Sequence, residues 1–172
     1  MMMKKNSLIA ISSFAALLLL VGFIYSQALT GVVHYDDTAN LQPLERVQDF
    51  ASGLTYIFEG DSGPLGRPIA LATFALQASA WPNAANEFLL INILLHVANG
   101  VLLAWFGWLL AKAIPATKRI ALPFCLTLSA LWLLQPLLAS ASLIIVQRMT
   151  TLCTTFMLLG LIGYFTGRQR LT

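Results

Sequence analysis

Two adjacent carboxylates, Asp36 and Asp37, lie shortly after the first long apolar run of the 172-residue chain. A charged pair at the end of a membrane segment is costly to bury without partners, so three interpretations are open. One carboxylate can act as a general base on an acceptor hydroxyl, since burial raises a carboxyl pKa toward the working pH. The pair can instead bind a divalent cation through its oxygens, or it can flank a span as solvated charges.

Other polar side chains recur at helical spacing within two later apolar runs. Asn92, His96 and Asn99 follow one another at i, i+4 and i+7, which places them on one face of a helix. Gln147 begins a similar polar stripe in the last run. Polar groups in a bilayer face other helices or a cavity, so interhelical hydrogen bonds are the preferred interpretation. In the second interpretation the stripes wall a substrate cavity, and His96 and Gln147 contact the substrate.

Two arginines are suited to binding a phosphate, because a guanidinium presents planar donors that match phosphate oxygens. Arg148 lies near the outer end of the last run, and Arg67 lies in a Gly/Pro-rich segment. A long side chain near the end of a span can also extend to the lipid headgroups, which is the favoured interpretation of Arg148. The glycines near Arg67 lack the GKS or GKT ending of a phosphate-binding loop and therefore predict a turn.

The elements that must position these residues are membrane helices. The chain is 58% apolar and only 10% charged, with a mean hydropathy of +0.78, whereas ordinary soluble domains carry about 25% charged residues. This composition excludes a disordered chain and is typical of an integral membrane protein. Cys125 and Cys153 lie inside apolar runs without a neighbouring Cys or His cluster, so we expect no zinc site and two free thiols, with a disulfide as the alternative. The basic residues lie at the ends of apolar runs, so we expect no nucleic-acid partner.

Four apolar runs are long enough to cross hydrocarbon, which takes about 20 helical residues. We therefore predict an all-α membrane protein with one membrane domain over residues 1–172. The predicted spans cover about residues 8–28, 88–111, 120–138 and 143–165. The first run follows two lysines and ends in Ser-Gln-Ala, so a cleaved signal peptide over residues 1–28 is the alternative to a first span.

Charge predicts the orientation of these spans. Seven of the ten Lys and Arg residues lie at the N-terminus, between the second and third spans, or after the fourth. The positive-inside rule then places both termini in the cytoplasm of a bacterial cell and the loop of about residues 29–87 outside the inner membrane. Within this loop an amphipathic helix over residues 41–59 is predicted to lie on the membrane surface, and a short apolar helix over 69–81 is predicted to be interfacial or re-entrant.

Four motifs follow one another in a familiar order over about residues 30–165. They are Tyr35-Asp36-Asp37, Gly66-Arg67-Pro68-Ile69, the stripe Asn92, His96 and Asn99, and Ile145-Val146-Gln147-Arg148. Together they resemble the N-terminal membrane half of the GT-C superfamily of multi-span glycosyltransferases. The most similar members are the protein O-mannosyltransferases with tetratricopeptide repeats and their bacterial relatives.

The resemblance implies transfer of a sugar from a polyprenyl-phosphate donor to a protein or glycan acceptor at the outer face. It implies an essential acidic residue at Asp36 or Asp37, as base or as partner of a metal, and a basic residue near the donor at Arg67 or Arg148. Family members usually carry His-Pro where this chain has Gln135-Pro136. Their membrane module has seven or more spans, so we expect a truncated form or a partner chain that supplies the remainder. The alternative is a non-catalytic four-span accessory or scaffold subunit.

Overall fold

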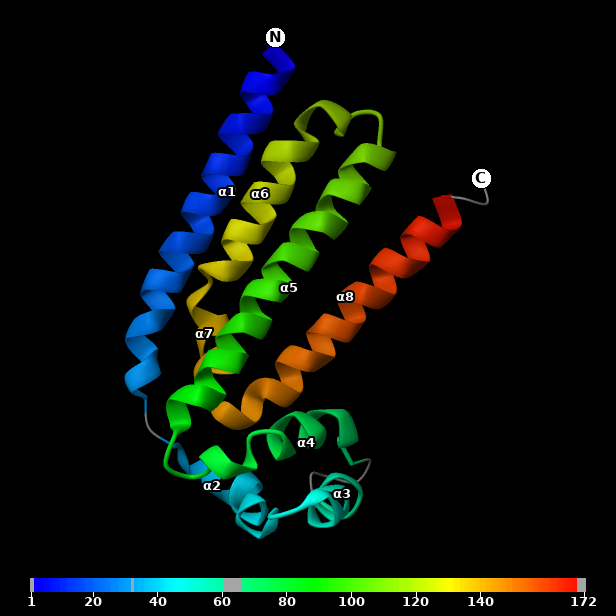
Figure 1. Ribbon diagram of the computed structural model, residues 1–172. Helices are drawn as coiled ribbons and strands as arrows, with labels where there is room; N and C mark the ends of the chain where they lie inside the picture. Colours follow the sequence, from blue (N-terminus) through cyan, green and yellow to red (C-terminus); the bar gives the residue numbers. More distant parts are fainter. Residues whose placement is uncertain (1, 32, 61–65, 170–172) are drawn as a thin grey trace.

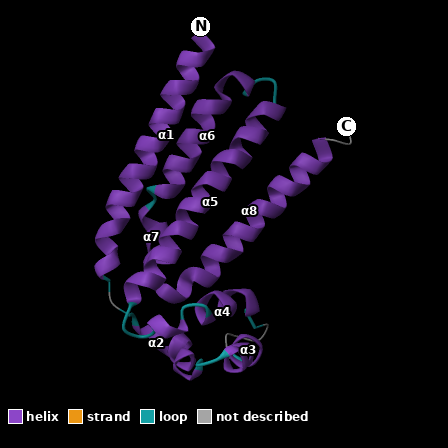
Figure 2. Cartoon of the chain, in the orientation of Figure 1, coloured by secondary structure: helices purple, strands orange, loops and turns teal. Residues whose placement is uncertain are grey.

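The computed structural model describes residues 2–31, 33–60 and 66–169, and its regular elements over these residues are helices (Figures 1 and 2). The long helices are α1 (Met2–Ser26), α5 (Ala85–Ala113), α6 (Ala121–Leu133) and α8 (Arg148–Gln169). The short helices α2 (Tyr35–Leu41), α3 (Phe50–Glu59) and α4 (Pro68–Ala75) form a cap at one end of the bundle. Both ends of the chain lie at the opposite end of the bundle (Figure 1).

Three segments are long and apolar enough to cross a membrane: Ile11–Thr30, Ala85–Ala113 and Ile145–Gln169. A fourth crossing results if α6 and the following helix α7 (Pro136–Leu143), which meet at 60°, are counted as one bent span. The architecture is that of an all-α membrane protein with three or four spans, in agreement with the sequence prediction.

The third predicted span, residues 120–138, is broken rather than straight. α6 has 13 residues, which at 1.5 Å per residue measure about 20 Å, well short of the ~30 Å hydrocarbon core. Gln135 is extended, with ψ of 116°, because a following proline disfavours the α conformation, and Pro136 then begins α7. The end of the third predicted span, from Pro136 onward, therefore belongs to a separate short helix, α7.

The predicted helix over residues 41–59 is also interrupted. A 3-10 helix, η2 (Gln42–Arg46), is followed by extended backbone at Val47, and Asp49 caps the start of α3. The Asp49 carboxylate accepts a hydrogen bond of 2.8 Å from the Ser52 backbone N–H. Hydrogen bonds from Ser52 hold the pKa of Asp49 below its ordinary value and fix the new helix start.

This interruption changes which face of α3 is buried. Gly53 and Tyr56 face the interior, whereas Phe50 and Phe58 are 83% and 74% exposed. The apolar residues at three- and four-residue spacing that predicted this helix include Leu54 and Phe58, which are exposed, and Leu44, which lies before α3 and is buried. Tyr56 lies two positions before Phe58 and therefore about 200° around the helix from it, on nearly the opposite face. The buried face of α3 therefore follows from packing and not from the apolar stripe.

Two apolar clusters hold the molecule together. The cluster beneath the cap joins α3 and α4 to the outer ends of α5 and α8, and Phe88 of α5 contacts the rings of Phe74 and Trp81 at centroid distances of 6.4 and 6.0 Å. The second cluster joins Val21 and Tyr25 of α1 to α5 and α6. The last turns of α1 therefore pack against the bundle, and the choice between a first span and a cleaved signal peptide stays a prediction.

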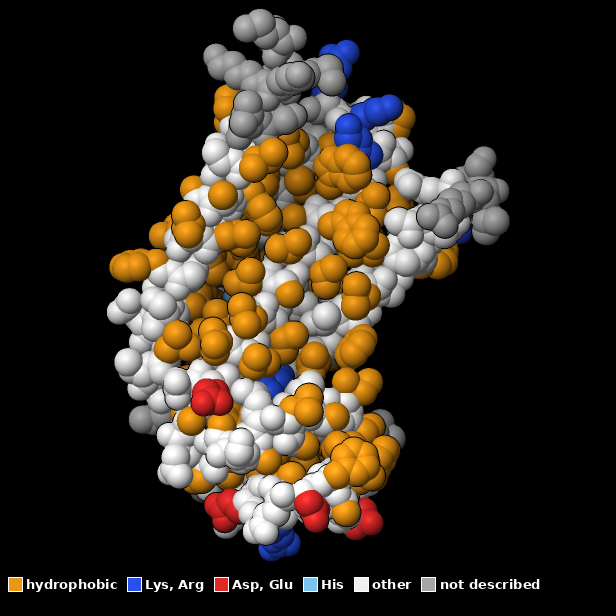
Figure 3. Space-filling view, viewed as in Figure 1, with side chains coloured by type: hydrophobic (Ala, Val, Ile, Leu, Met, Phe, Trp, Pro, Cys, Tyr) orange, Lys and Arg blue, Asp and Glu red, His pale blue; other side chains and the backbone are white. Residues whose placement is uncertain are grey.

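Charge and hydropathy are segregated along the bundle axis. Apolar side chains cover the helices between the two ends, and acidic side chains lie at the cap end, whereas basic side chains appear both at the opposite end and on the cap (Figure 3). This arrangement is typical of helices that cross a bilayer and contact water at both ends. The assignment of the basic end to the cytoplasm stays a prediction.

Candidate functional site

Asp37 anchors the cap to the beginning of the last span. Its side chain is fully buried, and its Oδ1 accepts a hydrogen bond of 2.7 Å from the Val146 N–H. Its Oδ2 accepts a second bond of 3.0 Å from the His34 N–H at the start of α2, where a carboxylate also interacts favourably with the helix dipole. Since both oxygens are bonded to backbone, the role of Asp37 is to hold α2 against the short helix η5 (Ile145–Gln147).

Asp36 differs from its neighbour because its side chain is exposed. No hydrogen bond of its carboxylate is found among the described residues, and its backbone carbonyl accepts from the Asn40 amide at 2.8 Å. Of the two carboxylates, that of Asp36 is accessible to a second molecule. The buried Asp37 fixes the backbone that carries it. The described part of the chain has no cluster of three His, Cys, Asp or Glu side chains suited to a metal, so a cation here would have Asp36 as its principal ligand.

Arg148 is fully buried at the junction of three helices. Its Nε donates to Asn92 Oδ1 at 2.8 Å, its Nη2 to the Phe88 carbonyl at 2.9 Å, and its Nη1 to the Thr73 carbonyl at 3.2 Å. The Phe74 ring centroid lies 4.5 Å from its Cζ, within cation–π range. The prediction that Arg148 extends to the headgroups is wrong, because α4 and α5 supply acceptors that draw the side chain inward.

The predicted polar stripe of α5 forms interhelical hydrogen bonds, as the preferred interpretation expects. Asn92 Nδ2 donates to the Ile144 carbonyl at 3.0 Å, at the break between α7 and α8. Asn99 Nδ2 donates to the Thr151 carbonyl at 3.0 Å, and its Oδ1 accepts from the Thr155 hydroxyl at 2.8 Å. These bonds join α5 to the connection between α7 and α8 and to the first turns of α8.

His96, between these two asparagines, joins three helices and is 2% exposed. Its Nε2 lies 3.4 Å from the Leu133 carbonyl and 3.3 Å from the Tyr25 hydroxyl, and its ring stacks on Trp132. The Leu133 carbonyl lies at the end of α6, where the helix break leaves carbonyls without intrahelical donors. His96 therefore supplies a polar partner for the Leu133 carbonyl at the helix break that precedes Pro136.

Gln147 and Arg67 occupy different surroundings at the outer end of α8. Gln147 is half-buried, and its Oε1 accepts a local bond of 2.9 Å from the Thr150 hydroxyl. Arg67 is exposed, and its Nη1 lies 3.0 Å from the Met149 sulfur, which is a weak acceptor. Arg67 and Met149 also line an apolar groove of about 220 Å³ between α4 and α8. The Arg67 guanidinium is thus accessible to an anion at the edge of a span.

Sequence reasoning did not identify Tyr56 as part of this region. Its side chain is 6% exposed, and its hydroxyl has no hydrogen-bond partner among the described residues. Burial raises the pKa of Tyr56, while the positive charge of Arg148 opposes this shift. The hydroxyl therefore stays protonated, and the ring fills the space between α3 and the Arg148 junction.

The structure brings two of the predicted groups to one end of α8. Asp37 bonds to Val146 and Arg67 contacts Met149, two positions three residues apart or about one helical turn. Asp37, the neighbour of Asp36, and Arg67 therefore both contact the first residues of the last span. His96 lies deeper, within the bundle. Comparison of the chain with family models, curated proteins and solved structures finds no match.

Proposed function

We propose that the chain is a membrane glycosyltransferase module of the GT-C type, which transfers a sugar from a polyprenyl-phosphate donor to a protein or glycan acceptor at the periplasmic face of a bacterial inner membrane. The observation that carries this proposal is the different environment of two adjacent carboxylates. Asp37 is fixed by two backbone N–H groups, while Asp36 is exposed at the outer end of the bundle. The ordered resemblance of the motifs to the GT-C family is the second support.

In the proposed mechanism the Asp36 carboxylate accepts the proton of the acceptor hydroxyl. The acceptor oxygen forms a bond to the anomeric carbon, the bond between that carbon and the phosphate oxygen breaks, and its electron pair leaves with the phosphate. Arg67 offsets the charge that develops on this phosphate, because its guanidinium is exposed and lies against Met149 at the same end of α8. Arg148 and Asp37 act as positioning residues, and contact of His96 or Gln147 with the substrate stays a prediction of the family resemblance.

We also infer that α4 lies at the membrane interface, beside the site. Ile69 and Leu76 are 58% and 87% exposed, although both are large apolar side chains. α4 packs against the outer end of α8, where a spanning helix leaves the bilayer. Lipid contact gives these exposed side chains an apolar environment, which water does not.

The exchange of Asp36→Asn tests the proposal, with sugar transfer measured in membranes that contain the full-length protein. We expect transfer to fall by about 10²- to 10⁴-fold, the usual contribution of a general base, without a change in melting temperature. Asp37→Asn is expected to lower the melting temperature and transfer together, because it leaves two backbone N–H groups facing one amide oxygen. Glu45→Gln, at an exposed acidic position of the cap, is the matched control and should change neither. Undiminished transfer by Asp36→Asn contradicts the mechanism.

A non-catalytic scaffold is the second candidate. It is favoured by the observation that Asn92, His96, Asn99 and Arg148 all use their polar groups in bonds between helices. A scaffold of this kind would bind a second membrane chain. If Asp36→Asn leaves glycosylation unchanged while such a chain co-purifies, this candidate replaces the first.

A further inference from the structure

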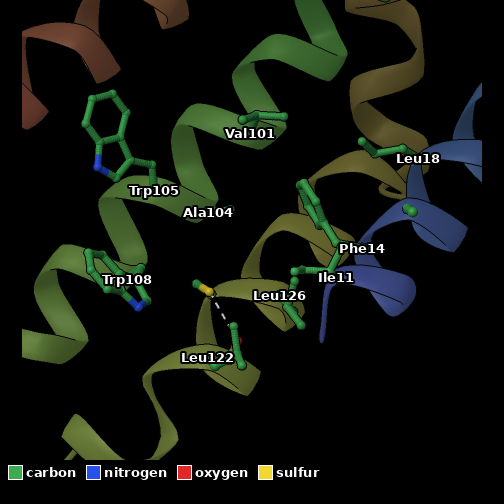
Figure 4. A pocket seen from close by; sticks show the side chains of 11 residues that line it. Ile11, Phe14, Leu18, Val101, Ala104, Trp105, Trp108, Leu122 and Leu126 are labelled. Carbon is green, nitrogen blue, oxygen red and sulfur yellow. Dashed lines mark hydrogen bonds between the residues drawn. The ribbon is translucent and has the colours of Figure 1, made fainter. Parts of the chain in front are cut away.

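A second feature lies far from Asp36, in the half of the bundle near the chain ends. Helices α1, α5 and α6 enclose a groove with a volume of about 540 Å³. The lining side chains come from α5 on one side and from α1 on the other, with α6 between them (Figure 4). Its lining is almost entirely apolar and includes Phe14, Leu18, Trp105, Trp108, Leu122 and Cys125.

Basic residues lie next to two walls of this groove, the walls formed by α5 and α6. Lys112 lies one helical turn beyond Trp108 on the same face of α5, and its Nζ is 5.6 Å from the Trp108 ring centroid. Lys118 and Arg119 precede the groove residue Leu122 by four and three positions. All three basic side chains are exposed.

These positive charges have no acidic counterpart in the part of the chain that surrounds them. The sequence has no Asp or Glu before Asp36 or after Glu87, and acidic side chains gather on the cap at the other end of the bundle. The groove therefore combines an apolar channel with an uncompensated cationic mouth. Tryptophan near that mouth is typical of the level of the lipid headgroups.

We propose that this groove binds an anionic glycerophospholipid from the leaflet on the side of the chain ends. One acyl chain occupies the channel between Phe14 and Trp105, and the phosphate interacts with Lys112, Lys118 and Arg119. Basic pockets between membrane helices recognise anionic lipid headgroups by this combination of charge and apolar contact.

Charge also argues against a second copy of the chain as the occupant. A copy inserted in parallel would bring its own Lys112, Lys118 and Arg119 to the same mouth, where like charges repel. A phospholipid supplies the missing negative charge and an apolar chain at once. The proposal is independent of the glycosyltransferase proposal, since it uses none of the residues near Asp36.

Lipid retention by the purified full chain tests this inference, with native mass spectrometry in detergent after addition of phosphatidylglycerol or phosphatidylcholine. We expect selective retention of phosphatidylglycerol. Its affinity should fall about fivefold for each charge removed in Lys112→Gln, Lys118→Gln and Arg119→Gln, since one basic residue contributes about 1 kcal/mol near an anionic headgroup. Arg168→Gln, on α8 at the same end of the bundle, is the matched control and should retain the lipid.

Filling the channel provides a second, steric test. Ala104→Phe places a ring in the groove and should reduce retention while leaving the three basic residues intact. Equal retention of the two lipids, an equal loss in Arg168→Gln, or no effect of Ala104→Phe in a folded protein would each overturn the proposal. So would a lipid-free dimer that Ala104→Phe dissociates, because the groove would then bind a helix.

Discussion

The two halves of the helix bundle are held together in different ways. In the outer half, next to the cap, Asn92, His96 and Asn99 of α5 bond to neighbouring helices, and Arg148 joins α4, α5 and α8. In the inner half, α5 contributes apolar side chains to an open groove, and α8 diverges from the other helices (Figure 1). The comparison indicates that hydrogen bonds between helices hold the cap in place, and with it Asp36, whereas the other half contains an open apolar groove.

The largest expected effect is the loss of the Arg148 junction. Arg148→Ala removes three donors and leaves buried acceptors on Asn92, Phe88 and Thr73 without them. Each such group costs about 1–3 kcal/mol, so we expect the free energy of unfolding to fall by at least about 3 kcal/mol. Unfolding in detergent, followed by circular dichroism, measures this change.

Arg67→Ala is the control for this prediction, because it also removes a guanidinium beside α8 but from an exposed position. Its effect on stability should stay within about 0.5 kcal/mol. Similar losses in the two variants would show that the outer half does not depend on the buried junction.

A smaller effect is expected from alanine at two glycines. A Cβ at Gly100 of α5 would lie 2.6 Å from a methyl carbon of Leu133, a fully buried side chain. Gly100→Ala should therefore cost about 1–3 kcal/mol of stability, as overpacking does. Gly160 of α8 meets nothing within 4 Å, so Gly160→Ala should be neutral or stabilise its helix by up to about 1 kcal/mol. Thermal unfolding of the two variants side by side checks this; destabilisation by Gly160→Ala would mean that α8 is tightly packed along its inner half.

Much of this architecture could be predicted from the sequence, because long apolar runs and polar side chains at helical spacing are local signals. They located the spans and showed that Asn92 and Asn99 share a face of α5. Both side chains donate hydrogen bonds from this face, Asn92 to Ile144 before α8 and Asn99 to Thr151 within it. The position of Pro136 was visible too, but not the 60° bend between α6 and the helix that Pro136 begins. The angle depends on how α7 packs against the rest of the bundle.

The roles of individual charged residues were less predictable. Asp36 and Asp37 are equivalent in the sequence, and the bond between Asp37 and Val146 joins residues 109 positions apart. The inward course of Arg148 likewise depends on Thr73 and Phe88, which lie 75 and 60 positions away. Contacts of this kind arise only from the packing of the cap on the bundle, so no local sequence pattern predicts them.

The central claim is that the cap carrying Asp36 faces the periplasm, and cysteine accessibility tests it most directly. In a chain with Cys125→Ala and Cys153→Ala, a single cysteine is introduced by Glu45→Cys in the cap or by Lys118→Cys at the other end, both exposed positions. The account predicts that a membrane-impermeant maleimide labels the Glu45→Cys variant on intact spheroplasts and the Lys118→Cys variant only after permeabilisation. The reverse pattern would place Asp36 in the cytoplasm and contradict the account.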